Sequence, residues 1–478
     1  MSESLAFDDI VLGRTLPLPG HMLKISPAEQ AYHSLVWGTT GVGKSKFLLT
    51  QLLQHISRHH AVCLLDPHGD LAEDCLTGLA GGGFFNRPDA YDRLVYVDFG
   101  ESHHVPFNIL GVKRFKPHVR AQNALDAFGR TWPEVQSAPH FRTLFLTSAM
   151  ILIANDLPLT DINRLLLDDA FRKACLQRVT DPFVRQMAGY FEKGLQGAAG
   201  STLRRSFLLG FDPVLRGCLA QTGNVFDIRR MMDWGVSLIV NLGSIQQAES
   251  RRLMGSLLMV QIEQAALSRA EMPASARRPW HCYVDEWPQM AATQRESLDN
   301  LLTQARKYNL RLCLAGQSPS QIEAGRLAGA LEQCRLSVTF RLGSESAARQ
   351  AKEIAVLDLD PAQASASAQM RQFVQDIQNL PPRVAYAKIA GEEPIQFSTL
   401  EVAEPPADVE LGTIMTEYRR RYQTPVQTEA SPFEGAIPPL GTGDVSRIDR
   451  MLQETGGMVV DFAAYFGEPG EDTNDDAD

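Results

Sequence analysis

Short apolar runs alternate with helical patterns along most of the first 400 residues. The runs that predict buried strands are Ser34–Trp37, Ala61–Leu65, Leu94–Val97, Val236–Leu242, Cys282–Val284, Leu310–Ala315, Leu336–Leu342 and Val384–Ile389. After the first run, apolar residues recur at helical spacing between Phe47 and Ile56. A strand, a turn, a helix and a second strand in this order are typical of a parallel sheet with both faces covered. The pattern therefore predicts an α/β fold built on a mostly parallel sheet.

The strand signal fades between residues 115 and 232, where helix formers dominate. Amphipathic stretches such as Ala121–Phe128 and Phe141–Ile153 are followed by turn signals that contain proline. We interpret this region as an all-α domain inserted into the sheet domain. The expected division is a lead-in at 1–33, the sheet domain at 34–114 and 233–400, the inserted domain at 115–232, and an acidic, largely disordered tail at 401–478.

The negative charge of the chain is concentrated at its C-terminal end. The 478 residues carry a formal net charge of −10 at pH 7. Residues 401–478 contain 17 acidic and 5 basic side chains, a net charge of −12, which leaves residues 1–400 at +2. The acidic balance belongs to the predicted tail rather than to the folded body. It therefore does not exclude DNA as a partner.

Targeting signals and cysteine spacing indicate the compartment. The longest nearly apolar run, Thr143–Ala154, is well short of the roughly 20 residues that cross a bilayer. The first ten residues include Glu3, Asp8 and Asp9 and lack the basic start and apolar core of a secretory signal. The seven cysteines form no CxxC pair and no zinc-ligand spacing. We expect a cytoplasmic chain with reduced thiols and no intrinsic membrane span.

A glycine-rich segment lies between the first predicted strand and the first predicted helix. It fits the pattern G-x-x-x-x-G-K-[ST] and consists of Gly38, Thr39, Thr40, Gly41, Val42, Gly43, Lys44 and Ser45. Glycines let backbone N–H groups converge on a β-phosphate, and the positive end of the new helix faces the same anion. Lys44 is expected to contact the β- and γ-phosphates of ATP, and the Ser45 hydroxyl to ligate Mg²⁺. A chance match in a turn is the alternative, which the flanking strand and helix disfavour.

Hydrolysis also needs an acid that holds the metal and a group that orients water. The apolar run His281–Val284 ends in two adjacent acids, Asp285 and Glu286. We expect Asp285 to hold Mg²⁺ through water and Glu286 to orient or deprotonate the attacking water. An acidic helix cap at a strand end is the plainer interpretation. Combined with the phosphate loop, the pair predicts an ATPase.

Two further polar residues stand at predicted strand ends, where a doubly wound sheet places its ligands. Asp66 ends the second predicted strand, and Gln317 follows the apolar segment Leu312–Gly316. Gln317 is expected to sense the γ-phosphate. A turn or cap role is the alternative for each of them.

Together these segments resemble a known family. The residues that carry the resemblance are Trp37–Ser45, Leu65–Leu71 (LDPHGDL), Pro106–Leu110 (PFNIL), Tyr283–Glu286, and Gln304–Tyr308 followed by Gln317. In this order they resemble the HerA/FtsK clade of P-loop ATPases, and within it the type IV coupling proteins of the TraD/TraG kind. The resemblance covers about residues 10–395 and includes a helical insertion where that family has one.

The resemblance implies a RecA-like P-loop ATPase domain in a homo-oligomeric ring, usually a hexamer. Such a ring uses ATP and Mg²⁺ to move DNA through a central channel without base preference. One subunit supplies an arginine to its neighbour's γ-phosphate, so that the site is complete only in one relative orientation. Motif order favours Arg341 for this arginine finger, with Arg306 as the second candidate. The implied catalytic residues are then Lys44, Glu286, Gln317 and Arg341.

The resemblance also implies partners. In the family, the helical insertion contacts the DNA-processing relaxosome, and the ring serves type IV secretion components. Typical coupling proteins carry N-terminal membrane helices, whereas this sequence begins almost directly at the ATPase domain. We therefore expect a cytoplasmic protein that partners recruit to the inner membrane, or one that serves a different cargo machinery. The acidic tail is suited to docking on a basic partner.

Three other functions share these motifs. They are a type IV secretion or pilus-assembly ATPase that does not act on DNA, a HerA-like motor for DNA processing or defence, and a nucleotide-binding scaffold without hydrolysis. The presence of Lys44, Ser45, Asp285 and Glu286 argues against the scaffold. The first two functions remain open at this point.

Overall fold

The computed structural model describes residues 8–17, 20–100, 103–135, 137–290, 302–321, 333–357, 365–389, 391–402 and 410–423, without the side chains of 190–201 and 204. Within these residues, eleven strands form one sheet in the order β2-β1-β11-β10-β9-β3-β8-β7-β4-β6-β5. The strands are β1 (Ile10–Thr15), β2 (Met22–Ile25), β3 (His33–Trp37), β4 (Ala61–Asp66), β5 (Leu94–Asp98), β6 (Ser237–Asn241), β7 (Trp280–Val284), β8 (Leu310–Gly316), β9 (Cys334–Thr339), β10 (Val384–Ile389) and β11 (Ile395–Thr399).

The sheet is mostly parallel, as the apolar runs predict. From β9 to β5 every neighbouring pair is parallel, and the pairs from β9 to β2 through β10, β11 and β1 are antiparallel. The central strands β4, β6 and β7 are buried along their whole length, because helices cover both of their faces. Their carboxyl ends therefore meet at one edge of the sheet.

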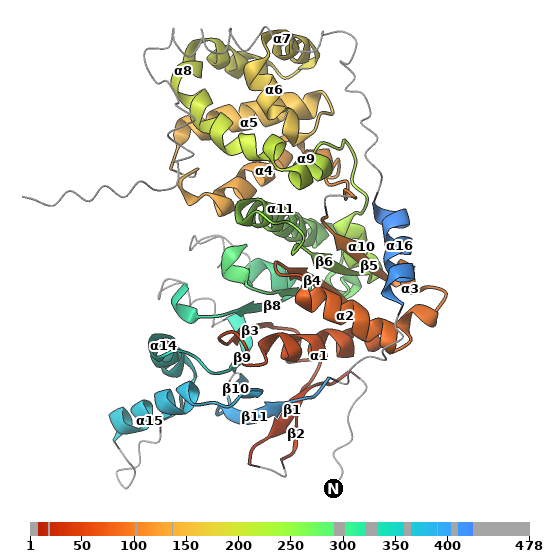
Figure 1. The fold of residues 1–478 in the computed structure, drawn as a ribbon. Helices are drawn as coiled ribbons and strands as arrows, with labels where there is room; N and C mark the ends of the chain where they lie inside the picture. Colours follow the sequence, from red (N-terminus) through yellow and green to blue (C-terminus); the bar gives the residue numbers. More distant parts are fainter. Residues whose placement is uncertain are drawn as a thin grey trace, which may run out of the picture.

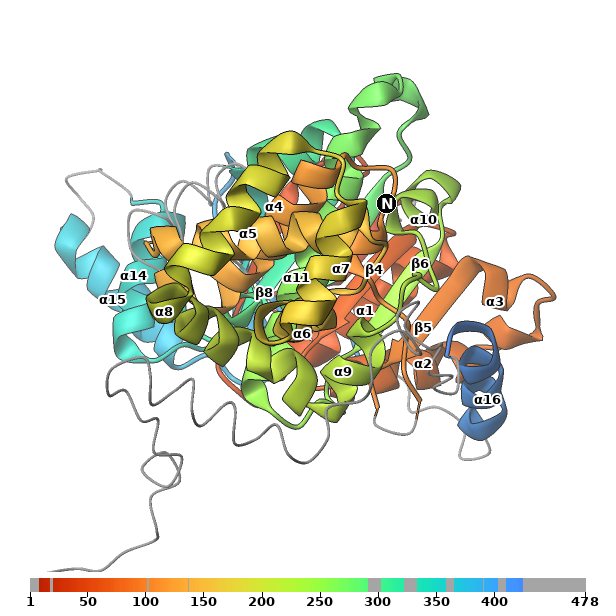
Figure 2. The ribbon, with the colours of Figure 1, turned by 90° about the horizontal axis from the view of Figure 1, so that it is seen from above.

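Helices pack on both faces of the parallel part (Figures 1 and 2). One face carries α1 (Lys44–Ser57) and α2 (Asp70–Gly81), which lie side by side, with the short α3 (Ala90–Arg93) beyond them. The other face carries α11 (Ala248–Leu267). Two helices that follow β9, α14 (Ser344–Ile354) and α15 (Ala366–Gln378), lie against each other near the antiparallel end.

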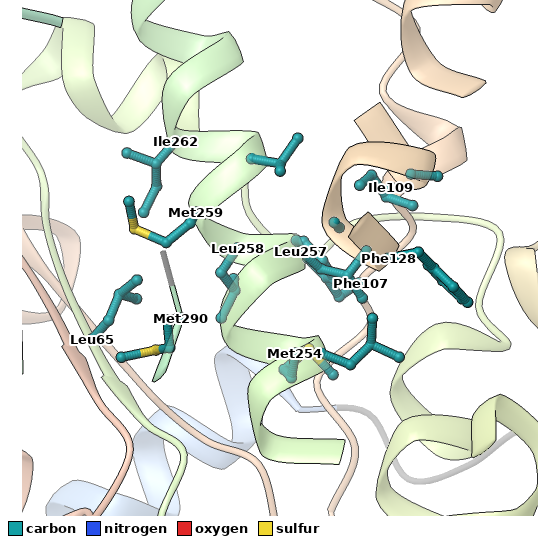
Figure 3. Packing of buried hydrophobic residues seen from close by; sticks show 14 of the residues in the cluster. Leu65, Phe107, Ile109, Phe128, Met254, Leu257, Leu258, Met259, Ile262 and Met290 are labelled. Carbon is teal, nitrogen blue, oxygen red and sulfur yellow. The ribbon is translucent and has the colours of Figure 1, made fainter. Parts of the chain in front are cut away.

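Helix α11 is buried around most of its circumference, because it lies between the sheet and a layer of further helices. Figure 3 shows Met259 and Met290 near Leu65 of β4, whereas Leu257 of the same helix lies near Phe107 and Phe128. A helix that is apolar on all sides is typical of such an internal layer. The helical domain and the sheet thus share one continuous core.

The layer beyond α11 is built from the chain between β5 and β6. Its helices are α4 (Pro117–Thr131), α5 (Pro139–Ala154), α6 (Ile162–Leu167), α7 (Asp169–Arg178), α8 (Pro182–Phe211), α9 (Pro213–Leu219) and α10 (Ile228–Trp234). In Figure 1 most of them stack above α11, on the side away from the sheet. Buried Arg130 of α4 donates to both carboxylate oxygens of Glu263 on α11, at 2.6 and 2.5 Å. This bidentate ion pair joins the layer to α11.

Two asparagines hold the two ends of this helical segment together. The Asn108 N–H donates to Asn224 Oδ1 at 2.8 Å, and Asn224 Nδ2 donates back to the Asn108 carbonyl at 3.0 Å. The Asn108 side chain also accepts from the Leu110 N–H and donates to the Thr222 carbonyl. The motif PFNIL therefore acts as a structural clamp where the chain leaves and re-enters the sheet domain.

The N-terminal segment differs from the expected lead-in at 1–33. Within it, β1 pairs with β11 and β2 pairs with β1, so both strands belong to the sheet. Ile10 and Leu12 are completely buried, and Gln54 of α1 bonds both the N–H and the carbonyl of Val11. The strands form because β11 would otherwise expose an unpaired edge.

The expected tail at 401–478 also contains an ordered element. Helix α16 (Leu411–Tyr422) packs beside β5, where the buried Tyr418 hydroxyl donates to the Leu94 carbonyl at 2.9 Å. Residues 424–478, for which we expect disorder, lie outside the described residues.

Among the helices of the described residues, none combines the length and apolar character that crossing a membrane requires. All seven cysteines are free and buried.

Candidate nucleotide site

The glycine-rich segment forms a loop that joins β3 to α1. The Gly38 N–H donates to the Gly316 carbonyl at the end of β8, and the Thr39 N–H donates to the Arg341 carbonyl at 3.2 Å. Gly41 and Gly43 have φ values of 79° and 100°, a region that glycine enters without steric cost. Gly43 is the N-cap of α1, so Lys44 and Ser45 lie in the first turn of the helix. Free N–H groups at this turn suit a phosphate.

Lys44 lies between the two acids that follow β7. Its Nζ is 2.9 Å from Asp285 Oδ1 and 2.7 Å from Glu286 Oε1. The three residues are only 7%, 5% and 3% exposed. Burial alone would lower the pKa of Lys44, but the two carboxylates outweigh it, so the pKa lies above its ordinary value. The structure thus brings together the phosphate-loop lysine and both acids, which are 241 and 242 residues apart in the chain.

The strand order explains why Lys44 contacts the two acids. β8 lies between β3 and β7, with Trp37 opposite Gly316 and Val284 opposite Leu314. The loop after β3 and the acids after β7 therefore emerge at the same sheet edge on either side of β8. Gln317, the first residue after β8, is half-buried at this edge.

Glu286 adopts a strained backbone conformation. Its φ of 48° lies in the left-handed region, which non-glycine residues seldom occupy. The Glu286 N–H donates to Asp285 Oδ1, and the Asp285 N–H donates to the Leu65 carbonyl of β4. Strain of this kind persists where the surroundings hold a side chain in a functional position. Here it directs the Glu286 carboxylate to Lys44.

The donor set fits a hydrated Mg²⁺ ion. Ser45 presents an exposed hydroxyl in the first turn of α1, and Asp285 presents a carboxylate at the facing strand end. Magnesium prefers such oxygen ligands and keeps several waters.

Asp66 accepts hydrogen bonds from the backbone of the turn that follows it. Its Oδ1 accepts from the His68 N–H and its Oδ2 from the Ala72 N–H, both at 2.9 Å. Burial raises the pKa of Asp66, and the nearby Asp285 adds to this rise. The carboxylate thus shapes the turn into α2, which is the capping alternative from the sequence.

The two candidate arginine fingers lie at opposite edges of the sheet, Arg341 at the carboxyl ends of the parallel strands and Arg306 at their amino ends. The Arg341 carbonyl accepts from both the N–H and the hydroxyl of Thr39, so Arg341 borders the phosphate loop of its own chain. Arg306 precedes β8 at the other edge, where its exposed guanidinium lies 3.6 Å from the ring centroid of Tyr32. Arg306 therefore lies far from its own phosphate loop.

Arg383, which no sequence motif marks, contacts the loop from the C-terminal hairpin. The Arg383 N–H donates to the Val42 carbonyl at 2.8 Å. A Cβ atom placed on Gly43 would lie 3.1 Å from Arg383 Cγ. The motif order gave no signal for this contact, because it joins positions more than 300 residues apart.

Comparisons with known proteins show the fold. No family model and no curated protein matches the sequence. Among solved structures, the chain is similar to the bacterial conjugative coupling protein TrwBdeltaN70 in an unbound form, with 18% identity, 83% of this chain and 92% of that chain covered, and a TM-score of 0.53. It is also similar to the plasmid coupling protein TrwB in complex with the non-hydrolysable ATP analogue ADPNP (19% identity, 80% and 89% covered, TM-score 0.50).

A third similar structure is VirB4 of Thermoanaerobacter pseudethanolicus, with 13% identity, 82% of this chain and 96% of that chain covered, and a TM-score of 0.50. These similarities confirm the predicted RecA-like P-loop ATPase fold with its mostly parallel sheet.

Proposed function

We propose that the chain is an ATP-driven motor that translocates DNA, in the manner of the coupling proteins of conjugation and type IV secretion. The observation that carries the ATPase part is the contact of Lys44 with Asp285 and Glu286 at one sheet edge. The fold shared with a conjugative coupling protein, and with TrwB bound to an ATP analogue, supports the motor part.

In this proposal, Lys44 exchanges its two carboxylate partners for the β- and γ-phosphates of ATP. Glu286, released from Lys44, accepts a proton from the attacking water while the bond from the γ-phosphorus to the bridging oxygen breaks, which gives ADP and phosphate. Ser45 and Asp285 would hold Mg²⁺, and the ion would supply positive charge against the phosphates. Gln317, at the end of the strand between the loop and the acids, hydrogen-bonds the γ-phosphate.

The ring and its partners belong to the same proposal. Copies of the chain assemble into a hexameric ring, and an arginine of one subunit reaches the nucleotide of the next. Arg341 remains the candidate from motif order, and its backbone carbonyl, bonded to Thr39, lies beside the phosphate loop of its own chain. The exposed position of Arg306 at the opposite edge favours a role in the neighbouring site. DNA, relaxosome proteins and secretion components at the inner membrane are the proposed partners of this cytoplasmic ring.

The central experiment is ATP turnover with and without DNA. We expect duplex or single-stranded DNA to stimulate phosphate release by the full chain, and the stimulation to weaken as salt rises, since phosphate contacts release counterions. The Lys44→Ala variant should lose turnover in both conditions. Turnover that no DNA changes at any salt concentration would contradict the translocase.

That negative result would favour the second candidate, a type IV secretion or pilus-assembly ATPase that does not act on DNA. A HerA-like motor for DNA processing or defence would share the DNA stimulation. Conjugative transfer from a strain that lacks the chain separates the two, because only the coupling function predicts loss of transfer.

A further inference from the structure

The turn before β10 holds an arginine in a conformation that favours glycine. The Val384 N–H donates to the Pro381 carbonyl at 3.2 Å and closes a four-residue turn, in which Arg383 has a φ of 67°. With Pro382 in the second position and a positive φ in the third, this is a type II turn, whose third position is usually glycine. The arginine carries a conformational cost that a glycine would avoid. Such strain points to a function of the side chain.

The backbone of Arg383 is fixed against the phosphate loop. Its N–H donates to Val42, and its carbonyl accepts from the Thr399 N–H of β11 at 2.9 Å. The contact between Gly43 and Arg383 Cγ places the start of the side chain at the N-terminus of α1. This is the place where a nucleotide's phosphates meet the helix.

The guanidinium is held by an exposed carboxylate and by one long hydrogen bond, from Nη2 to the Thr399 carbonyl at 3.5 Å. Its Nη1 lies 2.7 Å from Glu401 Oε1, and the two side chains are 40% and 83% exposed. An ion pair in water contributes little to stability, so exchanging Glu401 for another anion costs little. A polyphosphate is a stronger partner, because the planar guanidinium can donate two parallel hydrogen bonds to phosphate oxygens.

We propose that Arg383 is a second cationic ligand of the nucleotide at its own phosphate loop, and that its guanidinium moves from Glu401 to the polyphosphate of a bound nucleoside triphosphate. This inference rests on the proposed nucleotide site. In addition to Lys44 of α1, Arg383 of the C-terminal hairpin then contacts the nucleotide, so bound nucleotide links β10 and β11 to the phosphate loop.

The test compares the affinity of the full chain for Mg²⁺–ADPNP, measured by calorimetry, with its melting temperature. Arg383→Gly removes the guanidinium and suits the turn, so we expect a dissociation constant at least tenfold weaker with an equal or higher melting temperature. Arg383→Lys keeps a charge but loses the two-pronged contact, and should lie between the glycine variant and wild type. Glu401→Gln removes the carboxylate that competes for the guanidinium and leaves only the long hydrogen bond to the Thr399 carbonyl, so this variant should bind ADPNP as tightly as wild type or more tightly.

Asp156→Gly is the matched control, because Asp156 is another exposed charged residue with a positive φ of 52°, and it lies after α5 in the helical domain. It should raise the melting temperature without changing the affinity.

An Arg383→Gly variant that binds ADPNP within twofold of wild type overturns the inference. So does a loss of affinity accompanied by a lower melting temperature, which would assign a structural role. A wild-type chain that binds no ADPNP, or a Lys44→Ala variant that binds it as well as wild type does, overturns the proposed nucleotide site itself.

Discussion

At the scale of single residues, the two acids compensate the charge of Lys44 before nucleotide arrives. A buried lysine without an acidic partner would be costly, whereas here its ammonium donates a hydrogen bond to each of two carboxylates. These hydrogen bonds also keep the Glu286 carboxylate bound to Lys44. Hydrolysis in this scheme therefore begins only after the γ-phosphate has displaced Glu286.

Glu286→Gln separates binding from hydrolysis. The amide keeps the shape of the side chain and a hydrogen-bonding oxygen but cannot accept the proton of water, so we expect turnover to fall by about 10²–10⁴-fold. ATP affinity should stay near that of wild type, since Lys44 and the loop are unchanged. Single-turnover phosphate release and calorimetry measure the two quantities. A turnover near that of wild type would remove Glu286 from the role of base.

Mixed rings distinguish the two arginines. Arg306→Ala chains combined with Lys44→Ala chains should regain part of the ATPase activity, because an intact Lys44 site then faces an intact Arg306 of the neighbour. Arg341→Ala chains should gain nothing from the same partner if the Arg341 guanidinium acts within its own chain. The opposite pattern of rescue would return Arg341 to the position that motif order gives it.

A buried histidine makes the fold sensitive to acid. His33 is almost fully buried between the Leu302 carbonyl and the Leu312 N–H. Burial lowers the pKa of His33 to about 4, further helped by Arg306. The unfolded chain titrates near 6.5, so it binds more protons than the folded chain between these pH values. The contribution of His33 to the free energy of unfolding is complete above pH 6.5 and decreases as the pH falls to 4, by roughly 3 kcal/mol in total.

The His33→Gln variant tests this dependence. The amide can replace both hydrogen bonds but does not titrate. We expect the free energy of unfolding, measured by urea denaturation from pH 7.5 to 4.5, to fall less steeply in the variant, by up to about 1.4 kcal/mol per pH unit. His55 and His281, whose pKa values burial also lowers, supply the slope that remains. Equal slopes in the two proteins would show that His33 titrates normally.

At the scale of elements, the pair Asn108 and Asn224 joins the helical segment to the sheet. Replacing either by alanine leaves buried backbone groups without partners, which should destabilise the chain by about 1–3 kcal/mol. The Asn224 side chain bonds the backbone of Asn108, and the Asn108 side chain bonds Leu110 and Thr222. Because both side chains hold the same two segments together, the double variant should lose less than the sum of the single variants. A double-mutant cycle by chemical denaturation measures the difference. Strict additivity would show that the clamp does not act as a unit.

The sequence predicted the parallel elements well and the antiparallel ones poorly. All eight apolar runs overlap observed strands. Seven of these strands belong to the parallel part, where strands covered on both faces need nearly uninterrupted apolar residues. The eighth is the antiparallel β10, whose residues alternate in burial. β2 (Met22–Ile25) alternates over only four residues, and β1 contains a register shift between Val11 and Gly13, so neither has enough periodicity to be recognised. β11 was missed for the same reason, since its five residues are only partly buried.

The candidate site also contains residues that the sequence predicted and one that it did not. Lys44 and the two acids were predictable for two reasons. They lie in short motifs of recognisable chemistry, and both motifs follow the carboxyl ends of parallel strands. The contact of Arg383 with Val42 depends on how a distant hairpin closes over the loop, which no local pattern records.

At the scale of the whole molecule, α16 changes where the acidic tail can be cut. Residues 424–478 carry 12 acidic and 2 basic side chains, so their removal brings the formal charge of the chain from −10 to zero. A chain that ends at Gln423 keeps Tyr418 on Leu94 and should melt like wild type. If the tail competes with DNA for basic surface, this truncation should tighten DNA binding severalfold at low salt, as anisotropy titration measures. Unchanged affinity would show that the tail does not compete.

The pairing of β1 with β11 has a consequence for biosynthesis. Gly13 stands opposite Thr399, so a strand made among the first residues finds its neighbour only when almost the entire ordered chain has left the ribosome. A nascent chain can form the glycine loop early, yet the hairpin that carries Arg383 closes on it last. Nucleotide binding through both Lys44 and Arg383 is therefore expected only after Thr399 has left the ribosome.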